Sequence, residues 1–282
     1  MRVEVLATLQ CEDRSGIVNA LTSAVLEING NILENQQFTD SLTNTFVMRT
    51  RFETNAELKD AKSSLAERLN TYSPNLQVRD FNKPKRALLL VTKASHCLRD
   101  LLYLKDLGEM PAEFPVVIGN HVDLRPLVES HKLPFIHLDS EKRSKSEIEA
   151  EITKVASESK IDFIVLARYM QVLSPEFCSR FASKIINIHH SFLPGFKGAR
   201  PYHQAHAKGV KVIGATAHFV TSDLDEGPII EQDVVRVNHA STPDDFIAIG
   251  RDIERRVLSS AVKLYAEDRI FFVGNRTIVF SK

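Results

Sequence analysis

The sequence has no tryptophan, few cysteines and no excess of charge of either sign. The three cysteines, Cys11, Cys97 and Cys178, lie far apart and form no C-x-x-C pair, so we expect no structural zinc site. A sparse, odd number of thiols is typical of a reducing compartment. Basic and acidic residues both number 36 and the sequence has no basic stripe, so we expect no nucleic-acid partner.

Long apolar runs are also missing. No stretch approaches the roughly 20 apolar residues that a membrane-spanning helix needs. The first residues follow a strand-like pattern rather than that of a signal peptide. Apolar residues make up 43% of the 282 residues and charged residues 26%. This balance predicts a water-soluble globular protein of one or two domains, which we expect in the cytoplasm.

The first 80 residues alternate between strand and helix patterns. A strand-like run is followed by a stretch with helical spacing, a hairpin, a second helix and a last strand. The second helix opens on Thr54-Asn55-Ala56-Glu57, a capping-box pattern. The order βαββαβ is that of a ferredoxin-like unit. The expected strands are 3–11, 31–39, 45–52 and 75–80, and the expected helices are 17–28 and about 54–72.

A polar, proline-containing segment, 81–86, separates this unit from a sequence of different character. There, short continuous apolar runs alternate with candidate helices, a pattern typical of a parallel sheet covered on both faces. A long helix at 242–267, capped by Ser241 or Thr242, and a strand or hairpin at 270–280 complete the pattern. The expected strands are 87–91, 115–118, 135–138, 163–166, 185–188, 213–220 and 229–237, with helices at about 97–107, 123–131, 145–158 and 175–182. We therefore predict an α/β protein with two domains, 1–83 and 84–282.

Polar residues able to act on a carbonyl group lie at the ends of two apolar runs. Asn187 is within the last residues of one run, and His189 follows that run directly. Asp225 lies in the loop after a later run. Alternation along an extended chain puts the side chains of Asn187 and His189 on one face. A carboxamide, an imidazole and a carboxylate can stabilise an oxyanion, transfer a proton and orient water without a metal or a covalent nucleophile.

Each of these features also has a purely structural explanation. Asn187 and His189 can be buried polar residues that neighbouring loops satisfy. Asp225-Glu226-Gly227-Pro228 is ordinary turn chemistry. The segment Gly195-Phe196-Lys197-Gly198 is either a flexible connection or a lid. The residues alone leave both explanations open.

Two other clusters suggest different chemistry. His203 and His206 lie three residues apart on a candidate helix, where they can share a face. No H-E-x-x-H pattern and no carboxylate at ligand spacing accompany them, so we expect no metal. Cys97 stands at the start of a helix beside His96, where a thiol gains nucleophilicity. A Cys–His–Asp hydrolase is therefore an alternative to direct attack by water.

The turn after the first strand of the second domain contains no glycine over residues 92–102. A backbone cradle for phosphate at this position needs glycine, because only glycine allows the close approach. The sequence therefore argues against a Rossmann dinucleotide site and against a phosphorylated co-substrate held by this turn.

Three motifs together resemble those of the formyltransferase fold that uses 10-formyltetrahydrofolate. They are Asn187-Ile-His-His-Ser-Phe-Leu-Pro194, His218-Phe-Val-Thr221 with Leu224-Asp-Glu-Gly-Pro228, and Tyr169-Met-Gln-Val-Leu-Ser-Pro175. The last resembles the folate-binding loop of that fold. The resemblance covers residues 86–282 and implies a mostly parallel, Rossmann-like sheet. It also implies that folate is the substrate and that no further cofactor is bound.

Within that fold the sequence most resembles the formyltetrahydrofolate deformylases. The glycine-rich phosphate loop of the related transferases is replaced by Ser95-His-Cys-Leu-Arg-Asp100. Gln171 stands where the transferases typically carry arginine, and His190 where they usually have proline. Residues 1–80 resemble an ACT domain, which these deformylases carry and the transferases lack. The resemblance implies hydrolysis of 10-formyltetrahydrofolate to formate and tetrahydrofolate, which supplies purine biosynthesis and balances one-carbon pools.

The resemblance also implies roles for particular residues. Asn187 and His189 bind the oxyanion that develops at the formyl carbon. Asp225 pairs with His189 or with the attacking water and assists proton transfer. The pterin lies between two loops whose backbone amides read its edges. These loops supply Tyr169, Met170, Gln171, Val172 and Leu173 on one side and Thr221, Ser222 and Asp223 on the other.

For residues 1–83, the ACT resemblance implies an amino-acid effector site formed between paired domains, and a homodimer or homotetramer. The residues expected at that site are Asp13, Gly16, Asn29 and Asn31. Asp13-x-x-Gly16 is equally well explained as a turn before a helix. Two further functions remain open, a formyltransferase with an amine acceptor and a non-catalytic sensor of folate or amino acids.

Overall fold

The structure, a computed structural model, describes residues 2–195 and 201–281, and its contacts divide the chain into two compact units. The first unit runs to Pro84 and also takes 268–274 and the residues from Ile278 on. The second unit comprises Lys85–Glu267 with Asn275–Thr277. The division after residue 84 lies close to the boundary expected from the sequence. The C-terminal residues differ from that expectation, because most of them group with the first unit.

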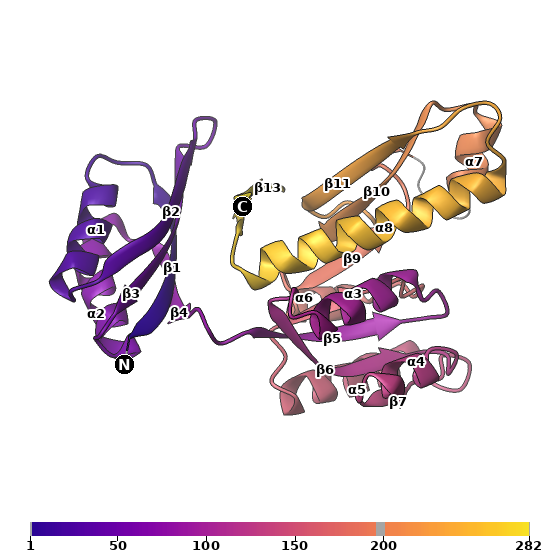
Figure 1. The fold of residues 1–282 in the computed structure, drawn as a ribbon, viewed down its shortest axis with the longest axis horizontal. Coiled ribbons are helices and arrows are strands. Elements are labelled where there is room, and N and C mark those ends of the chain that lie inside the picture. Colours follow the sequence, from indigo (N-terminus) through magenta and orange to yellow (C-terminus); the bar gives the residue numbers. More distant parts are fainter. Residues whose placement is uncertain (1, 196–200, 282) are drawn as a thin grey trace. The chain divides into compact units, whose positions relative to one another are not determined.

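The first unit is built on a four-stranded antiparallel sheet with strand order β2-β3-β1-β4 (Figure 1). Helices α1 and α2 pack side by side on one face. The elements are β1 (Val3–Glu12), α1 (Ile17–Glu27), β2 (Asn31–Asp40), β3 (Thr45–Thr54), α2 (Leu58–Leu69), the 3-10 turn η1 (Asn70–Tyr72) and β4 (Asn75–Asp80). The predicted βαββαβ order is confirmed.

The capping box expected at Thr54 is wrong in detail. Thr54 is still the last residue of β3, and α2 begins at Leu58 after Glu57. The Thr54 hydroxyl donates to the Ile28 carbonyl at 2.6 Å and accepts from the Ala56 amide at 3.1 Å. The residue that the sequence pattern assigns to the helix start therefore secures the end of a strand.

The second face of this sheet is covered by the C-terminal residues. Phe46 and Met48 point toward the helices, so the alternating side chain of Val47 faces the other way. There Val47 packs with Phe271, Phe280 and Ile278. Burial of these apolar groups explains why β12 (Ile270–Val273) groups with the first unit.

The second unit contains a seven-stranded sheet with strand order β11-β10-β9-β8-β5-β6-β7. Strands β9, β8, β5, β6 and β7 are parallel, whereas β10 runs antiparallel to both β9 and β11. The strands are β5 (Lys85–Val91), β6 (Ala112–Gly119), β7 (Phe135–His137), β8 (Phe163–Leu166), β9 (Ile185–His189), β10 (Val212–Phe219) and β11 (Ile229–Arg236), and β13 (Arg276–Val279) pairs with β12. This confirms the predicted, mostly parallel α/β sheet.

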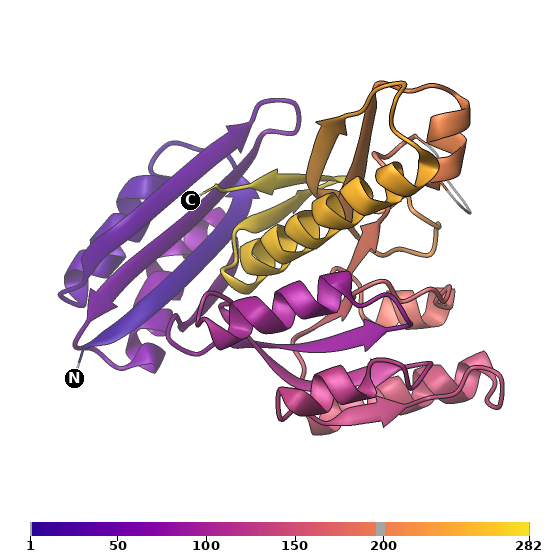
Figure 2. The same cartoon turned by 45° about the vertical axis from the view of Figure 1, so that its right-hand side comes forward.

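Helices cover both faces of this sheet (Figure 2). On one face α5 buries Ile148 and Ile152 against Leu88 and Ile164. On the other, α8 packs beside α3 and over β9, β10 and β11. The helices are α3 (His96–Asp106), α4 (Arg125–Ser130), α5 (Lys145–Glu158), α6 (Pro175–Arg180), α7 (Pro201–Ala207) and α8 (Pro243–Ala266). Thr242 caps α8 in a capping box with Asp245, as one of the two expected caps.

The strand order places a crevice next to β8. From β5 the chain proceeds through β6 and β7 to one side, and through β8 and β9 to the other. Ligands of open α/β sheets bind at such a reversal, outside the carboxyl ends of the strands. The loop that follows β8 carries Tyr169–Leu173 and begins at this point. None of the helices in the described part of the chain is long and apolar enough to cross a lipid bilayer.

Candidate active site

Strands β9 and β10 hold three polar side chains over one face of the sheet. Asn187 and His189 alternate with buried apolar residues on β9 and share that face. Antiparallel pairing puts His218 of β10 directly opposite Asn187. The Asn187 Nδ2 and His218 Nε2 atoms are 3.2 Å apart. Sequence reasoning included His218 in a motif but gave it no role, because the motif does not reveal this pairing.

The loop between β10 and β11 brings Asp225 back onto β9. The Asp225 Oδ1 atom lies 3.2 Å from His189 Nδ1. Gly227 allows this return, because a Cβ atom there would stand 1.8 Å from the Phe219 carbonyl oxygen. The Phe219 amide also donates to the Pro228 carbonyl at 2.9 Å. The Asp-x-Gly-Pro turn therefore does more than reverse the chain, since it delivers a carboxylate to the imidazole.

Hydrogen bonds fix the proton positions around Asn187. The Nδ1 atom of His218 lies 2.9 Å from the Phe219 carbonyl oxygen, which can only accept, so Nδ1 carries a proton. In the tautomer with no proton on Nε2, His218 accepts there from one N–H of Asn187 at 3.2 Å. The second N–H of that carboxamide stays available to a ligand. His218 Nε2 also lies 3.6 Å from Asp225 Oδ1, within ion-pair distance.

The carboxylate of Asp225 lies among imidazoles. Burial raises the pKa of Asp225, but its contacts with His189 and then His218 lower that pKa by more. The pKa of Asp225 is therefore well below the usual range of an aspartate, and the carboxyl is ionised at neutral pH. Next to it, burial and the positive charge of Arg168 lower the pKa of His190 to about 4, which keeps that ring neutral. His189 Nε2 is buried and has no hydrogen-bond partner among the described residues. A buried nitrogen that lacks a hydrogen-bond partner indicates a ligand-binding site.

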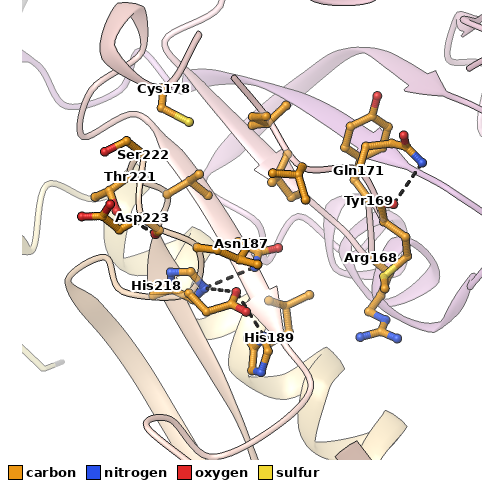
Figure 3. Close-up of a pocket in the computed structure, with 18 of the residues that line it drawn as sticks. Arg168, Tyr169, Gln171, Cys178, Asn187, His189, His218, Thr221, Ser222 and Asp223 are labelled. Carbon is orange, nitrogen blue, oxygen red and sulfur yellow. Dashed lines mark hydrogen bonds and ion pairs between the residues drawn. The ribbon is translucent and has the colours of Figure 1, made fainter. Parts of the chain in front are cut away.

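These residues line a cavity of about 230 Å³. That is less than the roughly 300–1,000 Å³ of pockets that enclose a whole drug-sized ligand, so the cavity suits only part of a molecule as long as a folate. The loop after β8 and the β10–β11 loop form opposite walls (Figure 3). All eight residues expected to bind the pterin lie there, namely Tyr169, Met170, Gln171, Val172, Leu173, Thr221, Ser222 and Asp223.

Local contacts hold both walls in place. The Met170 amide donates to the Thr92 hydroxyl at 3.0 Å, which ties the first loop to the end of β5. The Thr221 hydroxyl donates to the Asp223 carbonyl at 3.1 Å within the second loop. Burial, and then the charge of Glu149, raise the pKa of Tyr169 to about 12, so its phenol is neutral.

A buried polar cluster adjoins the cavity, and sequence reasoning found only part of it. Glu254 of α8 is 1% exposed. Its carboxylate accepts from His96 Nε2 at 2.8 Å and from the Tyr202 hydroxyl at 2.7 Å, and it lies 3.3 Å from Arg168 Nε. In the sequence Glu254 is one charge in an amphipathic helix. Nothing in its spacing marks it as buried.

Cys97 belongs to the same cluster but is a poor nucleophile there. Burial, and then the negative charge of Glu254, raise the pKa of the Cys97 thiol well above its usual value. His96, Cys97 and Glu254 also have ligand atoms within 4.8 Å of one another. Arg168 and two hydrogen bonds already occupy the Glu254 carboxylate, so this geometry does not favour a cation.

The four residues expected at an effector site fall into two places. Asp13 and Gly16 line a surface depression with Gln37 and Thr39 at the N-terminal end of α1. Asn29 and Asn31 lie beyond the other end of this helix. The 11 residues of α1 separate the two pairs by about 16 Å within one chain. Residues 196–198 of the expected flexible loop lie outside the described residues.

The open α/β sheet, with an Asn–His–Asp site beside its crevice, defines a class of protein. The sequence profile of the family described as Formyl transferase matches residues 85–262, more than half of the chain. A solved glycinamide ribonucleotide transformylase 1 from Symbiobacterium toebii is 30% identical, with a TM-score of 0.67 over 70% of this chain and 94% of that one.

More similar relatives extend over both units. The formyltetrahydrofolate deformylase of Escherichia coli O6:H1 (strain CFT073) is 45% identical over 278 residues, which is 98% of each chain. The crystal structure of a formyltetrahydrofolate deformylase from Pseudomonas syringae pv. tomato has a TM-score of 0.95 and 40% identity, and covers 100% of this chain and 95% of that one. The chain belongs to the formyltetrahydrofolate deformylase family of enzymes.

Proposed function

We propose that this chain hydrolyses 10-formyltetrahydrofolate to formate and tetrahydrofolate. The names of its relatives supply the reaction. The observation that carries the proposal is the meeting of Asn187, His189 and Asp225 in one cavity, with His189 Nε2 buried and aimed at no described partner. This arrangement provides donors for an oxyanion and a carboxylate for water. A protein that only binds folate has no need of that set.

The mechanism follows from which atoms are engaged. Asp225 holds the His189 ring through Nδ1, so a protonated His189 presents Nε2–H to the cavity. Together with the spare N–H of Asn187, it stabilises the oxygen of the formyl group as water attacks the carbon. The ionised Asp225 orients this water and takes part in moving its proton. The C–N10 bond then breaks, N10 gains a proton, and formate leaves.

The two loops provide the substrate site in this proposal. Tyr169–Leu173 and Thr221–Asp223 enclose the pterin, and the rest of the folate extends outside the cavity. Folate is substrate here, and the reaction needs no other bound cofactor. The physiological outcome is a supply of formate for purine biosynthesis and a balanced one-carbon pool.

The direct test is an incubation of the purified chain with 10-formyltetrahydrofolate and water alone. We expect stoichiometric release of formate and tetrahydrofolate. The rival transferase function predicts little formate until an amine acceptor such as glycinamide ribonucleotide is added. A folate sensor predicts binding without turnover. Absence of formate from a sample that binds folate normally refutes the proposal.

For the first unit we propose an ACT domain that binds an amino-acid effector and joins copies of the chain into a homodimer or homotetramer in the cytoplasm. The depression lined by Asp13 and Gly16 supports an effector site at one end of α1. Asn29 and Asn31 can join such a site only if a second copy supplies them. Thermal unfolding with each amino acid in turn should show a rise in Tm for one of them, and Asp13→Ala should abolish the rise.

A further inference from the structure

Arg168 occupies an unusual position at the start of the folate loop. It comes two residues after the end of β8 and lines the same cavity as His189. Its backbone has φ of +63°, a conformation that costs a residue with a side chain of order 1 kcal/mol. Asp225, in the facing wall of the same cavity, also has positive φ, at +57°.

The guanidinium of Arg168 forms an ion pair through its Nε atom. Its Nε atom lies 3.3 Å from Glu254 Oε2, while His96 and Tyr202 occupy the rest of that carboxylate. The Nε and Nη1 atoms are both buried and have no hydrogen-bond partner among the residues that the structure describes, so Nε is satisfied only by the ion pair and Nη1 by nothing described. A buried guanidinium nitrogen without an acceptor is costly. A ligand in the cavity can supply that acceptor.

Arg168 and His189 line the same cavity, and two further observations relate their side chains. The ring of His190 lies 5.3 Å from the His189 ring, and Arg168 is close enough to His190 for its charge to act on that ring. Figure 3 shows the Arg168 side chain leaving Tyr169 and Gln171 and running toward the end of the site that holds His189. Arg168 Nη1 and His189 Nε2, both without a hydrogen-bond partner among the described residues, therefore belong to side chains that line one cavity.

Hydrolysis differs from transfer in the charge of its product. A transferase passes the formyl group to an amine and makes a neutral amide. Hydrolysis consumes water and yields tetrahydrofolate, formate and a proton, so an anion appears in a buried site. A buried anion needs a cation and hydrogen-bond donors. Arginine supplies both, with a geometry suited to carboxylates.

We propose that Arg168 is a further catalytic residue, which binds the formate anion as it forms. Asn187 and His189 keep the oxygen that came from the formyl group, and Arg168 Nη1 donates to a formate oxygen as the C–N10 bond breaks. The electron pair of that bond goes to N10, which takes a proton. Glu254 balances the Arg168 charge while the site is empty. This inference rests on the proposed hydrolysis.

The test compares inhibition by the two products. Formate should inhibit the wild-type enzyme when tetrahydrofolate is present. In Arg168→Met, we expect the formate inhibition constant to rise by about tenfold or more and kcat to fall by a similar factor, as for loss of a charged hydrogen bond. Arg168→Lys keeps the positive charge but lacks the planar guanidinium. Its formate inhibition constant and kcat should lie between those of the wild type and Arg168→Met. The inhibition constant of tetrahydrofolate and KM for substrate should stay unchanged.

The matched control is Arg125→Met, which removes an exposed arginine paired with Glu129 on α4 and should change neither constant. An equal rise in the inhibition constants of formate and tetrahydrofolate would indicate a collapsed cavity and would overturn the inference. Unchanged formate inhibition in Arg168→Met would also overturn it. The same holds if formate does not inhibit a wild-type enzyme that releases formate. Failure of the wild type to release formate at all refutes the proposed function instead.

Discussion

Asp225 carries the negative charge around which the candidate site is organised. Its carboxylate holds His189 Nδ1, and the contacts with His189 and His218 outweigh burial and keep its pKa below the usual range. Asp225→Asn keeps the size of the side chain and removes the charge. We expect kcat to fall by roughly 100- to 10,000-fold, the usual contribution of a positioned acid–base group. Formate release and far-ultraviolet circular dichroism, measured on the same sample, check this.

An exposed aspartate provides the comparison. Asp252 on α8 is 70% exposed and pairs only with nearby Arg255 among the described contacts. Asp252→Asn should leave kcat unchanged. A folded Asp225→Asn variant that turns over at the wild-type rate would remove Asp225 from the mechanism.

Asn187 makes a different contribution, because one of its N–H groups is free for the oxyanion. Loss of one such donor typically costs about 3–4 kcal/mol, or roughly 100- to 1,000-fold in rate. Asn187→Ala should therefore lower kcat by this factor with little change in KM. Steady-state kinetics of formate release measures the split. A rise in KM alone would assign Asn187 to substrate binding.

His190 makes the stability of the second unit sensitive to mild acid. Its pKa is about 4 in the folded chain against an ordinary value of 6.5, because burial and Arg168 disfavour its charged form. The unfolded chain therefore binds a proton that the folded chain does not, and stability falls as pH drops below 6.5. Between pH 7 and pH 5 this corresponds to about 2 kcal/mol.

Urea unfolding at these two pH values checks the effect. The wild-type free energy of unfolding should fall by about 2 kcal/mol more than that of His190→Asn. The carboxylate of Asp225 does not contribute in this window, because it is ionised in both the folded and the unfolded chain, and its stabilising effect is lost only as pH falls through the ordinary pKa of 3.8. Equal falls in the two proteins would contradict a buried neutral His190.

At the scale of elements, the β10–β11 loop depends on one close backbone approach. A Cβ atom at residue 227 would lie 1.8 Å from the Phe219 carbonyl oxygen, so Gly227→Ala must shift the loop that carries Asp225. Displacement by about 1 Å can cost roughly 100-fold in rate, whereas overpacking costs about 1–3 kcal/mol of stability. We expect kcat to fall by about 100-fold in a chain that still folds.

Gly209→Ala is the matched control for Gly227→Ala. Gly209 has positive φ, but a Cβ atom there would meet nothing within 4 Å. The substitution should cost about 1 kcal/mol of stability and leave kcat unchanged. A normal rate in Gly227→Ala would show that the loop tolerates the shift.

The elements themselves were largely predictable from the sequence, and the pairing of side chains across them was not. Continuous apolar runs identified the strands of the second unit, and the alternation of side chains along an extended chain correctly placed Asn187 and His189 on one face. The antiparallel direction of β10 was not predicted, so His218 gained no role. The helix start predicted at Thr54 was wrong, because a residue that is suited to cap a helix can equally end a strand. Glu254 is buried because of the helix face that packs on the sheet. The periodicity of the sequence does not show that a single charged residue lies on that face.

At the scale of the whole chain, the first unit depends on residues far away in the sequence. Phe271 and Phe280 are 7% and 9% exposed, and their rings pack edge to face at 5.4 Å beside Val47. A boundary drawn at residue 84 would leave this side of the four-stranded sheet uncovered. The β12 segment adds an ion pair between Arg269 and Glu34 at 2.9 Å, with Arg269 6% exposed.

Substitution of these aromatic residues measures that dependence. Phe271→Ala removes a buried ring, and such substitutions cost about 3–5 kcal/mol in well-packed cores. We expect the low end of this range, because the cluster is small and lies near the surface. Hydrogen exchange should show faster opening of β1 and β3, while amides in β5 and β8 keep their protection. Leu42→Ala, at an 82% exposed position between β2 and β3, should leave the protection of both groups of amides unchanged. Unchanged protection of β1 and β3 in Phe271→Ala would mean that the four-stranded sheet is stable without its C-terminal cover, and residues 1–84 would then fold alone.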